Sequence, residues 1–581
     1  MAGLPSTNEI ALTLRSLSHK QRRLFLGFGI SAIILIITLL WQADRAVSVL
    51  VPAPGGQLVE GIIGTPRFIN PLLVTSDADR DLTALIYSGL LRLDPSGKII
   101  PDLAESYTVS ADGLIYTFKL RDHLTWQDGK PLTADDVEFT VLEAQDPLLL
   151  GKKRGAWEGV RVEKLSPTEI RFHLKQAYPQ FLETATMGIL PKHLWSKFDV
   201  ETFSLNQFNT EPIGSGPYQI KNISQDGQGI ANYYDLEPFP NFTLGGVNIS
   251  LVRLRFYSNE TDLIAAYKRG EIDSLNAVSA ENAKTLEKEG ANILRSPLPR
   301  VFAVFFNQNK ALILANKEVR EALAMAVDQQ QVINEVLQGY GIPAYGPLPQ
   351  LFLKDLGVEL PNGSSTPKSA TTTDKITVAR KYLADHGWTW DESKKIWQKK
   401  SKKETTVLSF TITTADIPEL RHSAELVKSI WEKLGVKVSL KVYEIGDLDL
   451  NVIRPRQYDS LFFGEILGRT PDLFSFWHSG QRLDPGLNIA EYTNTTADKL
   501  LEETRGLIDR EKRQVNYQKI QDTISQDTPA VFLYSPEFLY LVPEPVKNVK
   551  LPLINTPSDR FLSIYQWYIN TDRVWKIFTR Q

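Results

Sequence analysis

Residues 112–137 read DGLIYTFKLRDHLTWQDGKPLTADDV, and no other stretch of the chain carries so many structural signals. Asp112-Gly113 precedes the alternating apolar and polar side chains of residues 115–120, which predicts a β-hairpin. Asp128-Gly129 predicts a second turn, because glycine adopts a positive φ without strain. Thr133 is suited to cap a following helix. Strand, turn and helix signals this close together indicate a mixed α/β protein.

The C-terminal half of the chain carries a clearer pattern. Residues 405–413 predict a strand, residues 417–434 a helix that ends at Gly435, and residues 436–442 another strand. A strand–helix–strand unit of this kind predicts a parallel α/β lobe with a right-handed crossover. Residues 317–337 predict one long helix.

Composition limits the kinds of protein this can be. The chain has 581 residues, 42% hydrophobic and 23% charged, so we expect a soluble globular part with several structural lobes. A net charge of −3 argues against nucleic acid as a partner. The absence of Cys excludes disulfides, thiolate metal sites, cysteine nucleophiles and lipid attachment through an N-terminal Cys.

Residues 24–41 (LFLGFGISAIILIITLLW) contain no charge and are long enough to span a bilayer. Four Lys or Arg side chains precede this run, so residues 1–23 are predicted to be cytoplasmic and the rest to lie outside. We favour an uncleaved signal anchor. The alternatives are a cleaved signal peptide, which residues 42–46 fit poorly, and a buried core helix. Residues 4–20 form either an amphipathic surface helix or a solvated tail, and residues 42–56 are predicted to be a linker.

Seven stretches in fixed order resemble the solute-binding proteins of family 5, the extracellular peptide- and nickel-binding proteins of ABC transporters. They are residues 93–107 (LDPSGKIIPDLAESY), 112–137, 214–218 (GSGPY), 269–273 (RGEID), 319–328 (VREALAMAVD), 424–440 (AELVKSIWEKLGVKVSL) and 458–464 (YDSLFFG). The resemblance spans about residues 58–545. Most of these residues are expected to be scaffold, as turns or helix starts.

The resemblance implies a two-lobed, periplasmic-binding-protein-like α/β fold of type II, in the large peptide-binding subclass, after one N-terminal transmembrane helix. The larger lobe would comprise residues 57–300 and 541–581, and the smaller lobe residues 301–540. Ligand would lie between the lobes and be trapped by hinge closure. The implied function is a membrane-anchored, extracytoplasmic binding protein of a prokaryotic cell that delivers oligopeptides to an ABC permease.

Two segments align with the family's ligand-facing loops. From them we take twelve candidate ligand-binding residues: Thr65, Arg67, Phe68, Asn70, Gly464, Glu465, Ile466, Leu467, Gly468, Arg469, Thr470 and Asp472. Phe476 and Trp477, which follow, are expected to belong to the core.

The second segment departs from the family pattern. Peptide-binding relatives often carry an Asp here that pairs with the peptide's α-ammonium group, whereas this chain has Arg469 or Thr470. Glu465 or Asp472 could take over that role. Alternatively, Arg469 could bind a ligand carboxylate through its planar guanidinium, or form an ion pair with a local acid.

Other functions have less support in the sequence. The seven His show no metal-binding spacing, and neither a nucleophile elbow nor a phosphate-binding loop occurs, so we expect no enzyme, metal site or cofactor. A surface sensor with the same fold and a non-peptide solute, such as a nickel chelate or an oligosaccharide, remain the alternatives.

Overall fold

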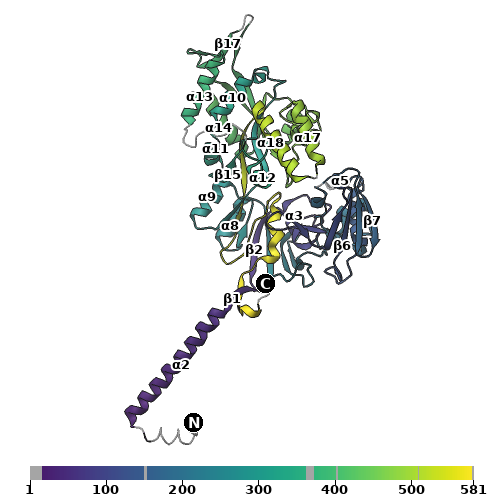
Figure 1. The fold of residues 1–581 in the computed structure, drawn as a ribbon, viewed down its shortest axis with the longest axis vertical. Helices are drawn as coiled ribbons and strands as arrows, with labels where there is room; N and C mark the ends of the chain where they lie inside the picture. Colours follow the sequence, from purple (N-terminus) through teal and green to yellow (C-terminus); the bar gives the residue numbers. More distant parts are fainter. Residues whose placement is uncertain are drawn as a thin grey trace.

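The computed structural model describes residues 16, 18–149, 154–178, 180–360, 372–400, 404–507 and 509–578. Helix α2 (His19–Val47) projects from one end of a large body that holds all the other elements (Figure 1). The possible helix at residues 4–20 lies largely outside the described residues.

Helix α2 contains the predicted membrane span. Its apolar window has a mean hydropathy of 2.5, and none of that window is buried against the protein. Within the described ranges it is the one helix that is long and apolar enough to cross a bilayer, although a signal sequence would also fit this description. Ser18 caps its start, reciprocally with Gln21.

The predicted linker contains a strand. Residues of β1 (Ser48–Ala53) pair antiparallel with β23 (Asn570–Trp575), which brings the C-terminal end of the described chain to the base of α2 (Figure 1). The Pro and Gly residues that suggested a linker lie at the end of β1 and after it. The strand β1 was not predicted because its pairing partner, β23, lies more than 500 residues away in the sequence.

A twelve-stranded sheet forms the centre of the body. Ten strands follow the order β20-β19-β21-β14-β22-β12-β2-β11-β10-β9, and β13 and β15 also pair with β22. Their bounds are β2 (Gln57–Ile63), β9 (Tyr218–Gln225), β10 (Ala231–Pro238), β11 (Leu251–Tyr257), β12 (Ser274–Leu275), β13 (Ile293–Pro297), β14 (Arg300–Phe306), β15 (Gly341–Pro343), β19 (Ser409–Ala415), β20 (Lys437–Tyr443), β21 (Ser460–Ile466) and β22 (Ala530–Leu541).

Strand β22 connects two hydrophobic cores. Its residues 530–534 pair with β14, and its residues 537–541 pair with β13. One core draws on buried side chains from Val301 to Tyr534, and the other on side chains from Leu58 to Trp567. Two separate cores joined by shared strands are what a two-lobed fold requires; the exact lobe boundaries stay a prediction.

A separate four-stranded sheet contributes its buried side chains to the core that runs from Leu58 to Trp567. It has the order β5-β6-β8-β7, with β5 (Ala104–Val109), β6 (Ile115–Leu120), β7 (Arg161–Ser166) and β8 (Glu169–His173). The antiparallel β5–β6 pair confirms the predicted hairpin. Thr133 caps α4 (Ala134–Gln145) in a capping box with Asp136, as predicted.

The other elements of the larger lobe are short. They comprise β3 (Leu91–Leu93), β4 (Ile99–Pro101), α3 (Asp77–Ile86), α5 (Arg154–Trp157), α6 (Phe181–Thr184), α7 (Lys192–Trp195), α8 (Glu260–Lys268), α9 (Ala280–Lys288), η1 (Val200–Leu205), η2 (Gln207–Asn209), η6 (Pro557–Gln566) and η7 (Lys576–Phe578).

The smaller lobe confirms the strand–helix–strand prediction. Strands β19 and β20 run parallel and are joined by α14 (Pro418–Leu434), which ends at Gly435 with φ 110°. The prediction of one helix over residues 317–337 is wrong. The chain forms α10 (Lys317–Ala326) and α11 (Gln329–Val336), because Val327 turns extended and Asp328 accepts the N–H of Gln330 as a new cap.

The remaining helices of this lobe cover its sheet. They are α12 (Gln350–Leu356), α13 (Thr372–Asp385), α15 (Ile445–Leu448), α16 (Phe474–Trp477), α17 (Thr495–Gly506) and α18 (Arg510–Asp527), with short helical turns η3 (Leu312–Ala315), η4 (Asp449–Ile453) and η5 (Ser479–Gln481). Strands β16 (Thr389–Asp391), β17 (Ile396–Lys400) and β18 (Thr405–Val407) form a small outer sheet. The basic residues 394–400 comprise the end of the β16–β17 turn and strand β17, and Lys399 pairs with Glu318 at 3.1 Å.

Candidate ligand site between the lobes

Two cavities lined by Arg469 lie where the two lobes meet, and a third adjoins them at Glu183. The first, of about 230 Å³, is lined by Glu183 and residues 93–99 of the larger lobe and by Arg469, Thr470 and Tyr517 of the smaller lobe. The second, of about 160 Å³, includes Arg469 among residues that otherwise come from the larger lobe. The third, of about 200 Å³, is lined by Glu183 and other residues of the larger lobe. A molecule in the first or the second cavity would contact both lobes.

Arg469 pairs with two carboxylates of the opposite lobe. Its Nη1 lies 3.5 Å from Glu183 Oε1, and its Nη2 contacts Asp559 Oδ1. The side chains of Arg469 and Asp559 are only 15% and 9% exposed, so this contact is largely shielded from water. Of the two alternatives for Arg469, the structure shows pairing with acids of the chain, although these acids are distant in sequence.

The carboxylate of Asp559 is held in place by its own helical turn. Asn555 and Thr556 donate their backbone N–H groups to Asp559 Oδ2, at 2.7 and 2.9 Å. This is the capping box at the start of η6. Asp559 therefore offers Oδ1 to Arg469 from a fixed position.

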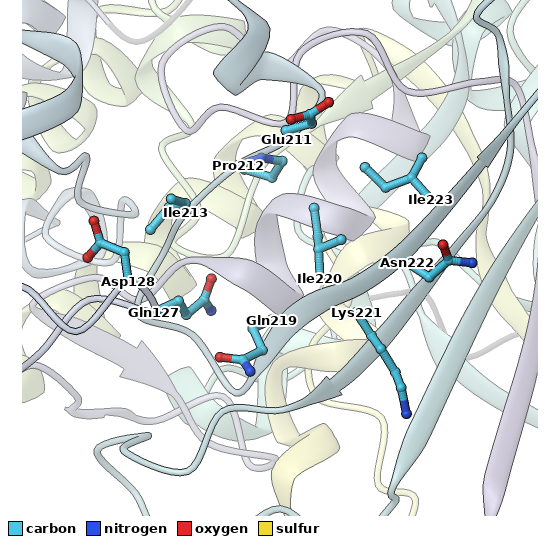
Figure 2. A pocket seen from close by; sticks show the side chains of 10 residues that line it. All are labelled: Gln127, Asp128, Glu211, Pro212, Ile213, Gln219, Ile220, Lys221, Asn222 and Ile223. Carbon is cyan, nitrogen blue, oxygen red and sulfur yellow. The ribbon is translucent and has the colours of Figure 1, made fainter.

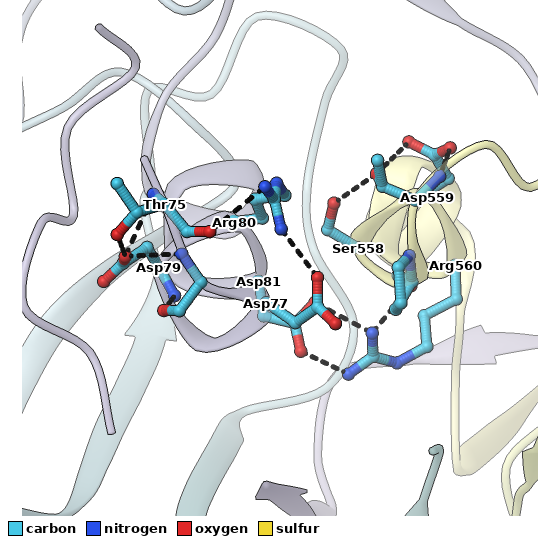
Figure 3. Close-up of polar contacts among 11 residues, drawn as sticks. Thr75, Asp77, Asp79, Arg80, Asp81, Ser558, Asp559 and Arg560 are labelled. Atoms are coloured by element: carbon cyan, nitrogen blue, oxygen red, sulfur yellow. Dashed lines mark hydrogen bonds and ion pairs between the residues drawn. The ribbon is translucent and has the colours of Figure 1, made fainter. Parts of the chain in front are cut away.

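The next residue, Arg560, fastens η6 to the core of the larger lobe. Its fully buried guanidinium donates to both carboxyl oxygens of Asp81 on α3, at 2.8 and 2.7 Å (Figure 3). Its Nε also donates to Glu60 Oε1 on β2, at 2.9 Å. Burial raises the pKa of Asp81 to about 6, with Arg560 opposing the shift and Glu60 adding to it. Through Arg560, Asp81 and Glu60, the turn η6 that carries Asp559 is thus joined to α3 and β2.

The first predicted ligand loop, residues 64–70, is built around Asp79. Arg67 and Phe68 donate their backbone N–H groups to Asp79 Oδ1, at 2.7 and 2.8 Å. Burial alone would raise the pKa of Asp79, but these hydrogen bonds and those from Ser76 outweigh it and lower the pKa. The carboxylate of Asp79, at the start of α3 (Figure 3), therefore holds residues 67–68 of the loop in place.

Side chains of this loop differ in their exposure. Arg67 is exposed, and Thr65 and Phe68 are partly exposed. Asn70 is fully buried, and its side chain accepts from the N–H of Leu72 at 2.9 Å and donates to Asn209 at 3.4 Å. Asn70 therefore holds the backbone of the loop in this conformation.

The second predicted segment leaves β21 and enters the junction. Gly464 lies against the ring of Phe302, where an added Cβ would be 2.7 Å from the ring, so a side chain has no room. Ile466 is 54% exposed, whereas Leu467 is buried and donates its N–H to Pro299 at 2.9 Å. Gly468 then turns the chain with φ 74° and brings Arg469 into the junction.

Glu465 does not face the cavities. It is 2% exposed, and neither carboxyl oxygen has a hydrogen-bond partner within the described part of the chain. Burial raises the pKa of Glu465 well above its ordinary value; the nearby indole of Trp477 favours the charged form but does not reach hydrogen-bonding geometry. The side chain is therefore a buried neutral acid in this conformation.

Asp472 is occupied within the smaller lobe. Its carboxylate pairs with Arg505 at 3.1 Å and accepts the N–H of Phe474, at the start of α16, at 3.2 Å. Trp477 is fully buried and contacts the ring of Phe305 in the core. Phe476 is partly buried against the same core. Of the twelve candidates, Arg469 and Thr470 line the cavities described here.

The largest cavity described lies elsewhere, in a groove of about 530 Å³ beside the edge strand β9 (Figure 2). Its lining comes from residues 127–128, 211–213 and 219–223, all in the larger lobe. A ligand in this groove would not touch the smaller lobe and could not drive closure. Size alone therefore does not identify the ligand site.

Metal chemistry finds no support in the part of the chain that the structure describes. There, no group of three or more His, Asp or Glu side chains could hold a metal ion. His173 pairs with Glu163, and His193 with Asp128, each at 2.7 Å.

The sequence profile of the bacterial extracellular solute-binding proteins, family 5, matches residues 98–485. The oligopeptide-binding protein AppA of Bacillus subtilis is 31% identical over 527 residues, which cover 89% of this chain and 92% of AppA. The chain belongs to family 5. It is therefore a solute-binding protein of the kind that serves ABC importers, with the two-lobed α/β fold that the sequence predicted.

Solved structures agree with this assignment. The structure of B. subtilis AppA in complex with a nonapeptide has a TM-score of 0.64 and 29% identity, and the match covers 90% of this chain and all of that one. The substrate-binding protein CtaP of Listeria monocytogenes has a TM-score of 0.71 and 28% identity, over 89% of this chain and 99% of CtaP.

Glu183 and Asp559 were not among the twelve residues predicted from the sequence. Glu183 lies 286 residues before Arg469, and Asp559 belongs to the C-terminal segment that returns to the larger lobe. Asp559 did carry a local signal, because Thr556 and Asp559 form a T-x-x-D capping pattern. That pattern predicts a helix start and contains no information about a partner in the other lobe.

Proposed function

We propose that this family 5 protein is a membrane-anchored, extracytoplasmic substrate-binding protein that captures oligopeptides between its lobes and delivers them to an ABC permease. The likeness to AppA, whose solved structure holds a nonapeptide, supports a peptide ligand. Helix α2 supports an anchor, with residues 1–23 on the cytoplasmic side and the two lobes outside. No catalytic role is part of this proposal.

The observation that carries the proposal is the set of cavities around Arg469. Each cavity is smaller than the range of about 300–1,000 Å³ that is usual for small-molecule sites. An elongated ligand that places groups in more than one of them fits better than a compact one. An extended peptide has this shape, since its side chains project alternately along the backbone.

Within this site we assign ligand contact to Arg469 and Thr470. The guanidinium of Arg469 matches the planar carboxylate of a peptide C-terminus. Glu183 and Asp559 pair with this guanidinium in the structure. A peptide carboxylate could replace the more exposed of the two, Glu183, while Asp559 keeps Arg469 in place.

The other predicted residues then act by positioning. Thr65, Arg67 and Phe68 belong to a loop that Asp79 fixes, and Gly464 and Gly468 allow the second segment to pass Phe302 and turn. We propose that these two loops form opposite walls of the closed cleft.

Native mass spectrometry of the full chain tests the proposal. The protein would be purified in detergent from cells grown on a peptide-rich medium and measured before and after denaturation. A series of co-purified peptides is the expected result. A single non-peptide mass would overturn the peptide assignment and leave the fold unaffected.

A protein purified without any bound mass would be titrated with a mixed peptide digest. Binding of none of its components would contradict peptide capture. Arg469→Ala is the matched variant, because it removes the proposed carboxylate contact from the same cleft. We expect it to retain fewer peptides than the original chain.

A further inference from the structure

The C-terminal strand returns to the foot of the anchor helix. Ser48, the first residue of β1, lies opposite Trp575, the last residue of β23. Figure 1 shows the C-terminal end of the chain at the junction of α2 and β1. The last described residues therefore lie beside the outer end of the predicted membrane span.

The end of β23 and the residue after it contact the last turn of α2. The indole Nε1 of Trp575 donates to Asp44 Oδ1 at 2.8 Å, and Lys576 Nζ donates to the carbonyl of Ala46 at 3.3 Å. Arg45, in the same turn, stacks over the ring of Trp41 one turn earlier, at 3.6 Å. Residues 575–576 are thus held against the helix at the level of residues 44–46.

Apolar side chains at this junction face outward. Val47 is 48% exposed, Leu50 62%, Trp575 50% and Ile577 78%. Leu50 and Trp575 belong to the two-stranded β1–β23 sheet, Val47 ends α2, and Ile577 follows β23. Because these exposed apolar side chains lie beside the predicted membrane span, the bilayer is the apolar surface that could cover them.

The geometry of the helix gives the depth of this cluster. An α-helix rises about 1.5 Å per residue, so Asp44 lies about 4.5 Å and Val47 about 9 Å beyond Trp41, where the uncharged run ends. The headgroup layer is about 5–7 Å thick on each side of the hydrocarbon core. Trp575, bonded to Asp44, is therefore at headgroup depth, where Trp is enriched in membrane proteins.

We propose that residues 44–50 and 573–577 form a membrane-facing collar, with residues 44–46 and 575–577 in the headgroup layer of the outer leaflet and residues 47–50 and 573–574 at its outer edge. The collar rests on the proposed anchor, because its depth is counted from α2. Trp575 and Ile577 would insert at the boundary between headgroups and acyl chains. Arg45, Arg573 and Lys576 would lie among the lipid phosphates, which carry the complementary charge.

The collar would hold the binding domain in a fixed orientation relative to the membrane. A single helix would otherwise let the domain tilt and rotate about one connection. A second contact, through a strand paired with β1, would hold the domain at a defined height and direction. A binding protein that must present its cleft to a permease in the same membrane benefits from both.

Site-specific fluorescence tests this proposal, and the absence of native Cys makes it straightforward. Three single-cysteine variants of the full chain, Ile34→Cys, Ile577→Cys and Leu205→Cys, would be labelled with a polarity-sensitive fluorophore. They would be reconstituted into vesicles of phosphatidylcholine and phosphatidylglycerol. Leu205, 85% exposed and far from α2 in sequence, is the matched control for an exposed apolar position.

We expect nitroxide lipids labelled at the headgroup to reduce emission at position 577 and to have no effect at position 205. Lipids labelled deep in the acyl chain should reduce emission at position 34. Quenching at position 34 without quenching at position 577 would overturn the collar and leave the anchor intact. Absence of quenching at position 34 would overturn the anchor, and with it the membrane placement of the collar.

Discussion

The contact between Arg469 and the larger lobe predicts how the ligand-free protein moves. In an open form, Arg469 leaves Glu183 and Asp559, and all three charges return to water. Replacing Arg469 with Ala removes the contact from the closed form only. We therefore expect Arg469→Ala to shift the ligand-free protein toward the open form.

The size of the shift follows from the burial of the partners. Arg469 and Asp559 are 15% and 9% exposed, and truncating one member of such a pair costs about 2–4 kcal/mol. The contact with Glu183, which is 28% exposed and 3.5 Å away, adds about 0–1 kcal/mol. Because about 1.4 kcal/mol is a factor of ten, the ratio of closed to open molecules should fall at least about 30-fold.

Single-molecule energy transfer measures this ratio. Leu205→Cys on the larger lobe and Leu483→Cys on the smaller lobe provide exposed label sites in a chain without native Cys. Arg454→Ala is the control, because Arg454 pairs with Asp449 at 2.9 Å within the smaller lobe. An unchanged transfer distribution in Arg469→Ala would refute the argument that this contact holds the lobes together.

Three further predictions concern buried residues. Above the ordinary glutamate pKa of about 4.3, the unfolded chain loses the proton of Glu465 that the folded protein keeps. The free energy of unfolding should therefore fall by about 1.4 kcal/mol per pH unit up to the raised pKa of Glu465, and Glu465→Gln should remove this dependence. Urea denaturation between pH 4 and pH 8 would show this slope, and an identical slope in the variant would contradict it. Arg560→Met should cost about 3–5 kcal/mol, because it leaves the carboxylates of Asp81 and Glu60 buried without their cation; an unchanged urea midpoint would argue against it. Gly435→Ala should lower the free energy of unfolding by about 1–3 kcal/mol, because φ at Gly435 is 110° and an added Cβ would lie 2.2 Å from the ring of Trp390. A melting temperature equal to that of the original chain would contradict this prediction.

The parts of the fold that were predicted correctly depend on neighbours in sequence. The β5–β6 hairpin, the Thr133 cap and the β19–α14–β20 unit each contain their own determinants within a few dozen residues. The error at residues 317–337 has the same origin. An apolar stripe continues from Ala326 and Val327 to Ile333 and Val336 across the break, and it masked the capping signal of Asp328 that begins α11.

The candidate site was predictable only in part, because its charges come from three distant segments. The turn at Gly468 and the guanidinium of Arg469 could be identified from local sequence and the family pattern. Their partners could not, since Glu183 lies on the four-residue helix α6 and Asp559 on a turn fixed by Arg560. These ion pairs depend on how the two lobes pack against each other, and such packing produces no periodic pattern in the sequence.

The pairing of Arg469 also has a consequence for ligand choice. A cleft whose cation is already neutralised by two carboxylates does not attract a ligand carboxylate through net charge, because the group of Arg469, Glu183 and Asp559 carries one excess negative charge. A ligand carboxylate that binds Arg469 would release Glu183, only 3.5 Å away, so a donor next to that carboxylate on the same ligand must pair with Glu183. The ammonium of a free amino acid, or the backbone N–H groups beside the C-terminal carboxylate of a peptide, can do this, whereas a simple anion would leave Glu183 unpaired at the lobe junction. The substitution of Arg for the family's Asp at this position is therefore compatible with peptide capture, because the acids that the loop lacks are supplied by the opposite lobe.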